Sequence, residues 1–147
     1  MSAPALPPRI PLVLPSKDPS FAALLENTAQ SSPFAFLTSA GPAITLETVR
    51  TNAPGVVLLD LDSVDTAEAS RLVLKLSLVS PAPVVLTGCE TFPGHPSLDP
   101  LFAAGAHGAL PKPEGKSSLG LVGEVGRIYL ERLLHLLPPH PREGGAA

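Results

Sequence analysis

The chain has 147 residues, of which 44% are hydrophobic and 16% charged, and its formal net charge is −3. This composition excludes a wholly disordered chain, which needs low hydrophobicity and high net charge, and the length is that of one domain with a sizeable core. The 10 basic residues form no stripe of the kind that neutralises nucleic-acid phosphates, so nucleic acid is not an expected partner.

Cysteine content and the length of the apolar runs indicate a cytoplasmic protein. Cys89 is the one cysteine, which excludes an internal disulfide framework and a multi-cysteine zinc site. No apolar stretch reaches the roughly 18 residues that span a bilayer, and the first residues lack the basic and apolar segments of a secretory signal. We therefore expect a cytoplasmic chain without a membrane partner.

Prolines and glycines crowd the two ends of the sequence. The chain has 19 prolines and 12 glycines, and residues 1–9 and 138–147 are rich in them. Such stretches are typical of flexible tails. We expect one domain over residues 10–137, with a flexible tail on either side.

The first half of this domain alternates between short apolar runs and amphipathic stretches. A strand is predicted over residues 10–14, then a helix over 20–30 with apolar residues at helical spacing. Asp18, followed by a proline, is the best N-cap for that helix. A second strand is predicted over 34–37, and a second helix over 44–51.

The second half continues the alternation. Residues 56–60 read Val-Val-Leu-Leu-Asp, and their apolar side chains on both faces predict a central parallel strand. Helix 66–79, strand 83–87, short helix 98–104 and strand 108–111 follow in order. The last helix, 118–137, has the clearest amphipathic period, which runs through Leu119, Val122, Val125, Ile128, Tyr129, Leu133 and Leu136. Five strand–helix units in this order predict an α/β fold, a doubly wound five-stranded parallel sheet with helices on both faces.

Polar residues stand where these strands end. Ser16, Lys17 and Asp18 follow the first strand, Asp60 ends the third, and Thr87 ends the fourth. Lys112 follows the fifth. Ligands of doubly wound sheets gather beyond the carboxyl ends of the strands, so the sequence predicts a site formed by these residues.

This set of residues resembles the receiver domain of bacterial response regulators. Residues 54–62, 83–88 and 103–113 are similar to the family's third strand, its fourth strand and the approach to its lysine, and the likeness runs over residues 10–136. The resemblance implies the (βα)5 flavodoxin-like receiver fold. It implies that Asp60 is the phosphoacceptor and that Thr87 and Lys112 bind the phosphoryl group. It also makes Asp62 a backbone-carbonyl metal ligand whose side chain lines the site.

Each of these residue types suits phosphoryl chemistry. A carboxylate at a strand end can attack a phosphoryl group and form an acyl phosphate. A hydroxyl across the sheet can bond the new phosphoryl oxygens, and an ammonium can neutralise their charge. Asp60, Thr87 and Lys112 have these three chemistries.

The chain departs from the family at the acidic pair that binds Mg²⁺. Ser16 and Lys17 stand at the positions of that pair, and neither can replace a carboxylate. We expect no metal and no cofactor, and a Lys17 ammonium paired with Asp60 in the place of the ion. A one-residue slip of the first strand would instead let Asp18 join Asp60 and Asp62 around Mg²⁺, at the cost of inverting the strand's faces.

Two further positions line the expected site. Ala109 stands three residues before Lys112, where the family commonly has an aromatic ring that turns inward when the phosphoryl group binds. Cys89 lies two residues after Thr87, and we interpret it as a packed thiol in preference to a redox-sensitive one. The loss of the ring weakens the case for an ordinary phosphorylation switch.

The sequence thus predicts a stand-alone, receiver-like signalling module of a bacterial two-component or chemotaxis and motility-type pathway. It is not expected to be an enzyme; it would act by protein contact, without Mg²⁺-dependent phosphorylation of Asp60. Its expected partners are a histidine kinase or an output protein, bound through the last two helices and the last strand, or a second copy in a homodimer.

Three alternatives remain. An ordinary single-domain response regulator would be phosphorylated on Asp60 by a histidine kinase in a phosphorelay that uses Mg²⁺. A small nucleotide-binding protein or enzyme on a flavodoxin-like sheet would need a phosphate-binding loop, but residues 15–19 have no glycine and two prolines. A purely structural dimerisation domain is the third.

Overall fold

The computed structural model describes residues 10–30, 32–39, 42–88, 95–112 and 122–137. The predicted flexible tails, 1–9 and 138–147, and Cys89 lie outside these residues. None of the helices among the described residues has the length and apolar character that a membrane span requires.

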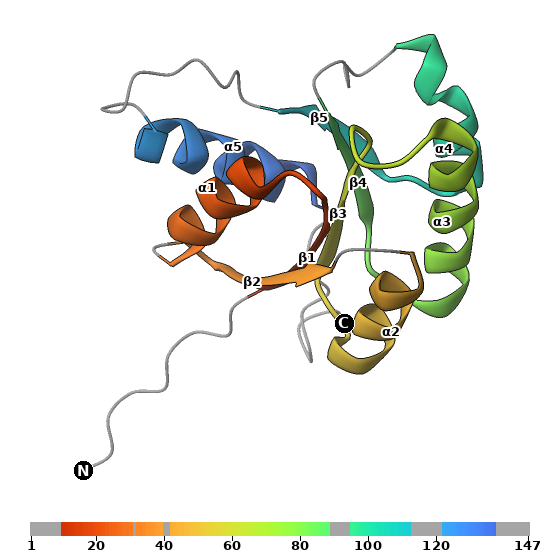
Figure 1. Cartoon of the computed structure of the whole chain (residues 1–147), viewed down its shortest axis with the longest axis horizontal. Coiled ribbons are helices and arrows are strands. Elements are labelled where there is room, and N and C mark those ends of the chain that lie inside the picture. Colours follow the sequence, from red (N-terminus) through yellow and green to blue (C-terminus); the bar gives the residue numbers. More distant parts are fainter. Residues whose placement is uncertain (1–9, 31, 40–41, 89–94, 113–121, 138–147) are drawn as a thin grey trace, which may run out of the picture.

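Strands and helices alternate along the chain (Figure 1). The strands are β1 (Ile10–Pro15), β2 (Phe34–Ser39), β3 (Val56–Asp60), β4 (Val84–Gly88) and β5 (Gly108–Pro111). The helices are α1 (Pro19–Ala29), α2 (Pro42–Asn52), α3 (Thr66–Val79), α4 (Asp99–Ala104) and α5 (Val122–Leu136), with a 3₁₀ turn, η1 (Pro96–Leu98), before α4. Every predicted strand and helix is present, with bounds that shift by one or two residues, apart from α5, whose predicted start lies outside the described residues.

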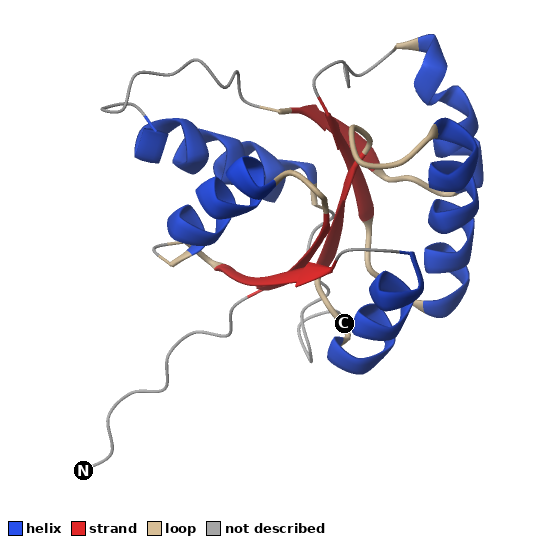
Figure 2. Cartoon of the chain, in the orientation of Figure 1, coloured by secondary structure: helices blue, strands red, loops and turns tan. Residues whose placement is uncertain are grey.

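The five strands form one parallel sheet in the order β2-β1-β3-β4-β5. Helices α1 and α5 cover one face, and α2, α3 and α4 cover the other, so the strands lie in the middle of three layers (Figure 2). The strand order reverses between β1 and β3, because β2 lies outside β1. This arrangement confirms the predicted doubly wound fold and puts a switch point next to Asp60.

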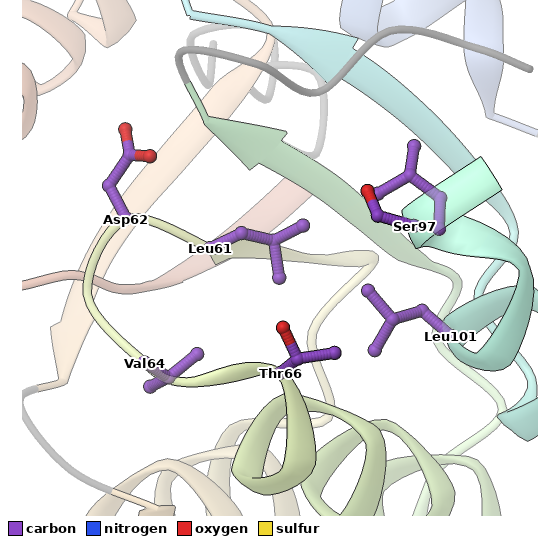
Figure 3. Close-up of a pocket in the computed structure, with 7 residues that line it drawn as sticks. Leu61, Asp62, Val64, Thr66, Ser97 and Leu101 are labelled. Atoms are coloured by element: carbon purple, nitrogen blue, oxygen red, sulfur yellow. The ribbon is translucent and has the colours of Figure 1, made fainter. Parts of the chain in front are cut away.

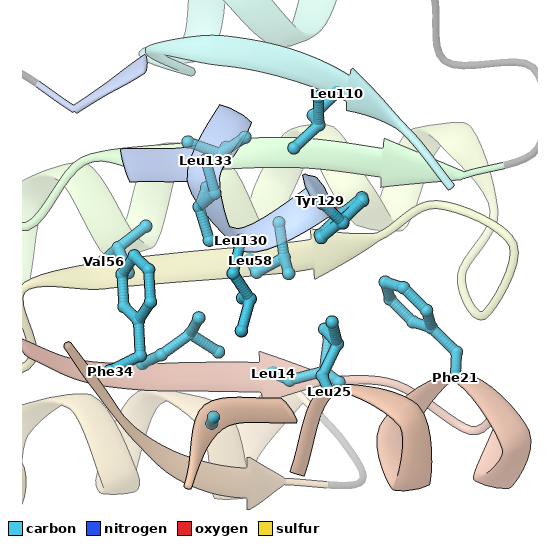
Figure 4. Packing of buried hydrophobic residues seen from close by; sticks show 13 residues of the cluster. Leu14, Phe21, Leu25, Phe34, Val56, Leu58, Leu110, Tyr129, Leu130 and Leu133 are labelled. Atoms are coloured by element: carbon cyan, nitrogen blue, oxygen red, sulfur yellow. The ribbon is translucent and has the colours of Figure 1, made fainter. Parts of the chain in front are cut away.

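Side chains of the central strands alternate between two cores. Leu14 and Leu58 point toward α1 and α5, where they pack with aromatic and aliphatic side chains of those helices (Figure 4), and Leu12 belongs to the same cluster. Val13 and Leu59 point the other way, into the core under α2, α3 and α4. All five side chains have no exposed surface, and burying one such side chain stabilises the fold by roughly 1.5–3 kcal/mol.

Helix ends follow ordinary capping chemistry. Asp18 caps α1 by accepting from the Ser20 and Phe21 amides at 3.1 and 3.2 Å, as the sequence predicts. Asp65 caps α3 in the same way, with the Glu68 amide at 2.7 Å. Gly105 ends α4 at a φ of 126°, a conformation that favours glycine.

The close contact of α1 with α5 depends on one glycine. A Cβ at Gly126 would collide with the side chain of Thr28, so only glycine allows this approach of the two helices. The amphipathic period of the last helix is correct at Tyr129 and Leu133, which are buried, but Ile128 is 40% exposed. The rotation of α5 about its axis brings Leu130 to the sheet in its place.

Candidate functional site

The candidate site lies at the carboxyl ends of β1, β3, β4 and β5. Asp60 ends β3 and is the register partner of Thr87 on β4. Lys112 directly follows β5, and its amide donates to the Gly88 carbonyl oxygen at 2.9 Å. The loop between β1 and α1 adds Ser16 and Asp18. Parallel strands thus bring together residues that are up to 96 positions apart in the sequence, from 16 to 112.

The Asp60 carboxylate is fully buried and fully bonded. Its side chain is 0% exposed. Oδ2 accepts from Ser16 Oγ at 2.6 Å, from Ser63 Oγ at 3.1 Å and from Lys112 Nζ at 2.9 Å. Oδ1 accepts from the Asp62 amide at 3.0 Å. Both oxygens therefore already have donors, and burial without such partners would cost several kcal/mol.

The Lys112 ammonium contacts three carboxylates. Nζ lies 2.9 Å from Asp60 Oδ2, 3.1 Å from Asp18 Oδ2 and 3.1 Å from Asp62 Oδ2, and the Lys112 side chain is only 7% exposed. It also lies 4.8 Å from the centre of the Phe21 ring. Burial alone would lower the pKa of Lys112, but its hydrogen bonds to Asp60, Asp18 and Asp62 outweigh burial and raise the pKa above its ordinary value.

Asp18 uses its two oxygens for different purposes. Oδ1 caps α1, and Oδ2 pairs with Lys112. Partial burial raises the pKa of Asp18. The hydrogen bonds from the Phe21 amide and the Lys112 ammonium lower the pKa by more than burial raises it, so the net shift is downward. Asp18 thus reaches the site from the N-terminus of α1.

The predicted ion pair of Lys17 with Asp60 is wrong. The Lys17 residue is exposed, and its contact with the site is through its backbone amide, which donates to Ser63 Oγ at 2.8 Å. The ammonium on Asp60 is that of Lys112. Lys17, at an expected metal-binding position, therefore does not supply the cation that pairs with Asp60.

Thr87 is held by a residue that the sequence reasoning did not select. Tyr129, on α5, donates its hydroxyl to Thr87 Oγ1 at 2.6 Å, and both residues are buried. Burial raises the pKa of Tyr129, because the phenolate would be stranded in the core. The Tyr129 ring packs edge-on against Phe21 at 5.6 Å between centroids.

Other residues of the site fall in three groups. Ala109 is buried on β5, under α3 and α4, where an aromatic ring would have to displace neighbours. Ser63 and Phe21 were missed; Ser63 stands three residues after Asp60, a spacing that could have indicated a turn, while Phe21 looked like an ordinary core residue of α1. Cys89 is not among the described residues.

A shallow cavity of about 210 Å³ adjoins the site on the side of α3 and α4. Its lining comes from the loop after β3, the start of α3, η1 and α4 (Figure 3). Leu61, Val64 and Leu101 give the lining apolar side chains, and Asp62, Thr66 and Ser97 give it polar ones. Asp62 therefore borders both the lysine cluster and this cavity.

The arrangement does not fit the Mg²⁺ that the receiver fold would imply. Among the residues that the structure describes, no group of acids, histidines or cysteines is arranged to hold a metal ion. The carboxylate oxygens of Asp18, Asp60 and Asp62 converge, but the point on which they converge is Lys112 Nζ. One Asp18 oxygen is also committed to the helix cap. Mg²⁺ needs oxygen ligands at roughly 2.0–2.1 Å in octahedral geometry, and a bound ammonium excludes it.

Solved structures that resemble this chain include receiver domains of response regulators. The CheB response regulator domain of Thermotoga maritima has a TM-score of 0.68 and 16% identity, over 87% of this chain and 96% of that chain. The chemotaxis response regulator CheY4 of Vibrio cholerae has a TM-score of 0.64 and 17% identity, over 88% and 99%. The receiver domain of a NarL response regulator from Mycobacterium tuberculosis has a TM-score of 0.63 and 20% identity, over 86% and 97%.

At these identities the likeness concerns the fold. The chain is an α/β protein with the five-stranded receiver fold, and its structural neighbours are signalling modules. No protein-family model matches the sequence, and no curated protein matches it.

Proposed function

We propose that this chain is a receiver-fold signalling module of a bacterial two-component or chemotaxis-type pathway. It acts by protein contact and is not phosphorylated on Asp60 by Mg²⁺-dependent chemistry. The observation that carries the proposal is the state of Asp60, which is 0% exposed and has a hydrogen-bond donor on each carboxylate oxygen.

A nucleophilic carboxylate needs an oxygen that a phosphoryl donor can reach. Three donors hold Asp60 Oδ2, and one of them is an ammonium that stabilises the negative charge in the ground state. Among the described residues, no buried side-chain nitrogen or oxygen lacks a hydrogen-bond partner. Such a satisfied network favours one fixed arrangement over a switch between two.

The hydroxyl of Thr87 supports the same proposal. In a receiver that switches, this hydroxyl is expected to bond the phosphoryl group, but here its oxygen accepts from Tyr129 at 2.6 Å. Mg²⁺ does not fit the cluster, because Lys112 occupies the point where the carboxylates meet. The carboxylate of Asp60, the hydroxyl of Thr87 and the ammonium of Lys112 thus each bond to another residue of the chain.

The proposed module is the domain over residues 10–137, in the cytoplasm, with residues 1–9 and 138–147 as tails. We place its partner contact on α4, β5 and α5. Phe102 of α4 and Ile128 and Leu134 of α5 support this choice, because they are large apolar side chains with 36–40% of their surface exposed. A histidine kinase, an output protein or a second copy would bind there.

The test is incubation of the purified chain with acetyl phosphate and Mg²⁺, followed by intact-mass measurement. We expect no gain of a phosphoryl group, and the same result for the matched control Asp60→Asn. A stable phosphoryl group on the native chain that Asp60→Asn abolishes would overturn the proposal. The chain would then be an ordinary response regulator that a histidine kinase phosphorylates on Asp60.

A further inference from the structure

The carboxylate cluster at the strand ends already contains a cation. Asp18, Asp60 and Asp62 come from the β1–α1 loop, the end of β3 and the loop after β3, and one ammonium joins them at 2.9–3.1 Å. Without it, three like charges would face one another, one of them on the fully buried Asp60, which disfavours their ionised forms. Lys112 therefore joins the segment after β5 to the β1–α1 loop and to the end of β3.

We infer that Lys112 is the resident cation of this cluster and makes the site independent of divalent metal ions. This inference rests on the proposed function and names how that site is kept in one state. Lys112 directly follows β5, and its backbone amide donates to the Gly88 carbonyl oxygen at 2.9 Å. Its ammonium lies 4.8 Å from the centre of the Phe21 ring. A metal ion would have to displace a cation that is tethered at the site.

The geometry also indicates which ion would replace Lys112. Its Nζ–oxygen distances are 2.9–3.1 Å. Ca²⁺ takes oxygens at about 2.3–2.6 Å in flexible geometry, so the three carboxylates would need to move inward by roughly 0.5 Å, against roughly 1 Å for Mg²⁺. Removal of the ammonium should therefore create a site that Ca²⁺ occupies more readily than Mg²⁺.

The experiment measures Ca²⁺ and Mg²⁺ binding by calorimetry and thermal melting, on the full chain and without a phosphoryl donor. The native chain should bind neither ion, and its melting temperature should not change at 10 mM, a concentration of roughly ten times the Kd of weak Ca²⁺ sites. Lys112→Met should bind one Ca²⁺ and melt about 4 °C higher in its presence. The matched control is Lys17→Met, which removes the same charge from an exposed residue and should bind no ion.

A second variant covers the case in which Lys112→Met does not fold. Lys112→Met combined with Asp18→Asn removes the ammonium and one carboxylate, so the uncompensated charge is smaller, and it should bind Ca²⁺ more weakly than the single variant. Absence of binding in both variants would overturn the inference. The inference would also be overturned if Ca²⁺ or Mg²⁺ raised the melting temperature of the native chain and the Asp60→Asn variant showed no such rise.

These outcomes separate the inference from the proposed function. Phosphoryl transfer to Asp60 that requires added Mg²⁺, in a native chain that binds no Mg²⁺ without the phosphoryl donor, would contradict the proposed function and leave Lys112 as the resident cation of the site. Metal binding by the native chain without phosphoryl transfer would contradict the inference alone.

Discussion

The candidate site has a charged half and a neutral half, and the two differ in what holds them. In the charged half, Lys112 joins three carboxylates, and the side chains of Asp18 and Asp62 are each 40% exposed. In the neutral half, a single hydrogen bond joins Thr87 to Tyr129, and both are buried. The comparison teaches that the charged half depends on solution conditions, whereas the neutral half ties the sheet to α5.

The largest effect should come from breaking the charged half at its centre. Asp60→Ala leaves Lys112, Ser16 and Ser63 without their shared acceptor, and one partner of a buried ion pair costs roughly 3–5 kcal/mol to remove. We expect the free energy of unfolding in urea to fall by about that amount. Asp60→Asn, which keeps the shape and an acceptor oxygen, should lose less. Equal losses in the two variants would show that the charge of Asp60, and not the shape of its side chain, decides the loss.

The next effect concerns the contact between α1 and α5, which joins the two halves because Asp18 caps α1 and Tyr129 lies on α5. In an open helix, glycine to alanine stabilises by about 0.8–1 kcal/mol. At Gly126 the new Cβ would meet Thr28, so we expect a loss of about 1–3 kcal/mol. Thr28→Ala should restore much of it, and Gly108→Ala, whose Cβ would meet Leu136 at an ordinary 3.8 Å, is the control. A stabilised Gly126→Ala chain would contradict the close packing.

The neutral half should give a smaller effect. Tyr129→Phe keeps the ring against Phe21 but removes the donor of the 2.6 Å bond to Thr87, which should cost about 1–2 kcal/mol. The cycle with Thr87→Val isolates the bond, and the double variant should lose less than the sum of the singles by about 1 kcal/mol. Strict additivity would mean that the bond does not couple β4 to α5.

The smallest effect is the dependence of stability on pH that Asp18 contributes to the charged half. The pKa of Asp18 is lowered from 3.8 in the folded chain, so the folded state binds fewer protons than the unfolded state. The stability that it contributes is present above about pH 4 and is lost as pH falls through the folded pKa. Urea midpoints between pH 5 and pH 3 should decline less steeply for Asp18→Asn than for the native chain. Parallel curves would exclude Asp18 as a source of the decline.

The neutral half and Lys112 should respond at the opposite end of the scale. The pKa of Tyr129 and the pKa of Lys112 are both raised in the folded chain, so their contributions are complete below the ordinary values of 10.0 and 10.5. They are lost as pH rises above those values. The Tyr129→Phe chain should lose less stability between pH 9 and pH 11 than the native chain, as measured by urea midpoints.

Much of the fold could be predicted because the signals are local. Strand β3 reads as apolar on both faces, and a chain that alternates such runs with amphipathic helices has few ways to cover them. The same order of elements predicted that Asp60, Thr87 and Lys112 would meet, since parallel strands end at one edge. These residues do meet there, and Asp18 caps α1 as its position before a proline indicated.

What the tertiary structure decided is which charge meets which. Lys17 and Lys112 both follow strands of the predicted site, and the sequence offers no physical reason to prefer one; the direction in which the β1–α1 loop turns exposes Lys17 and leaves Asp60 to Lys112. Likewise, the period of α5 marks Tyr129 as apolar-facing, but only the rotation of the helix brings its hydroxyl to Thr87. Hydrogen bonds depend on distances of a few tenths of an ångström, which packing sets and residue spacing does not.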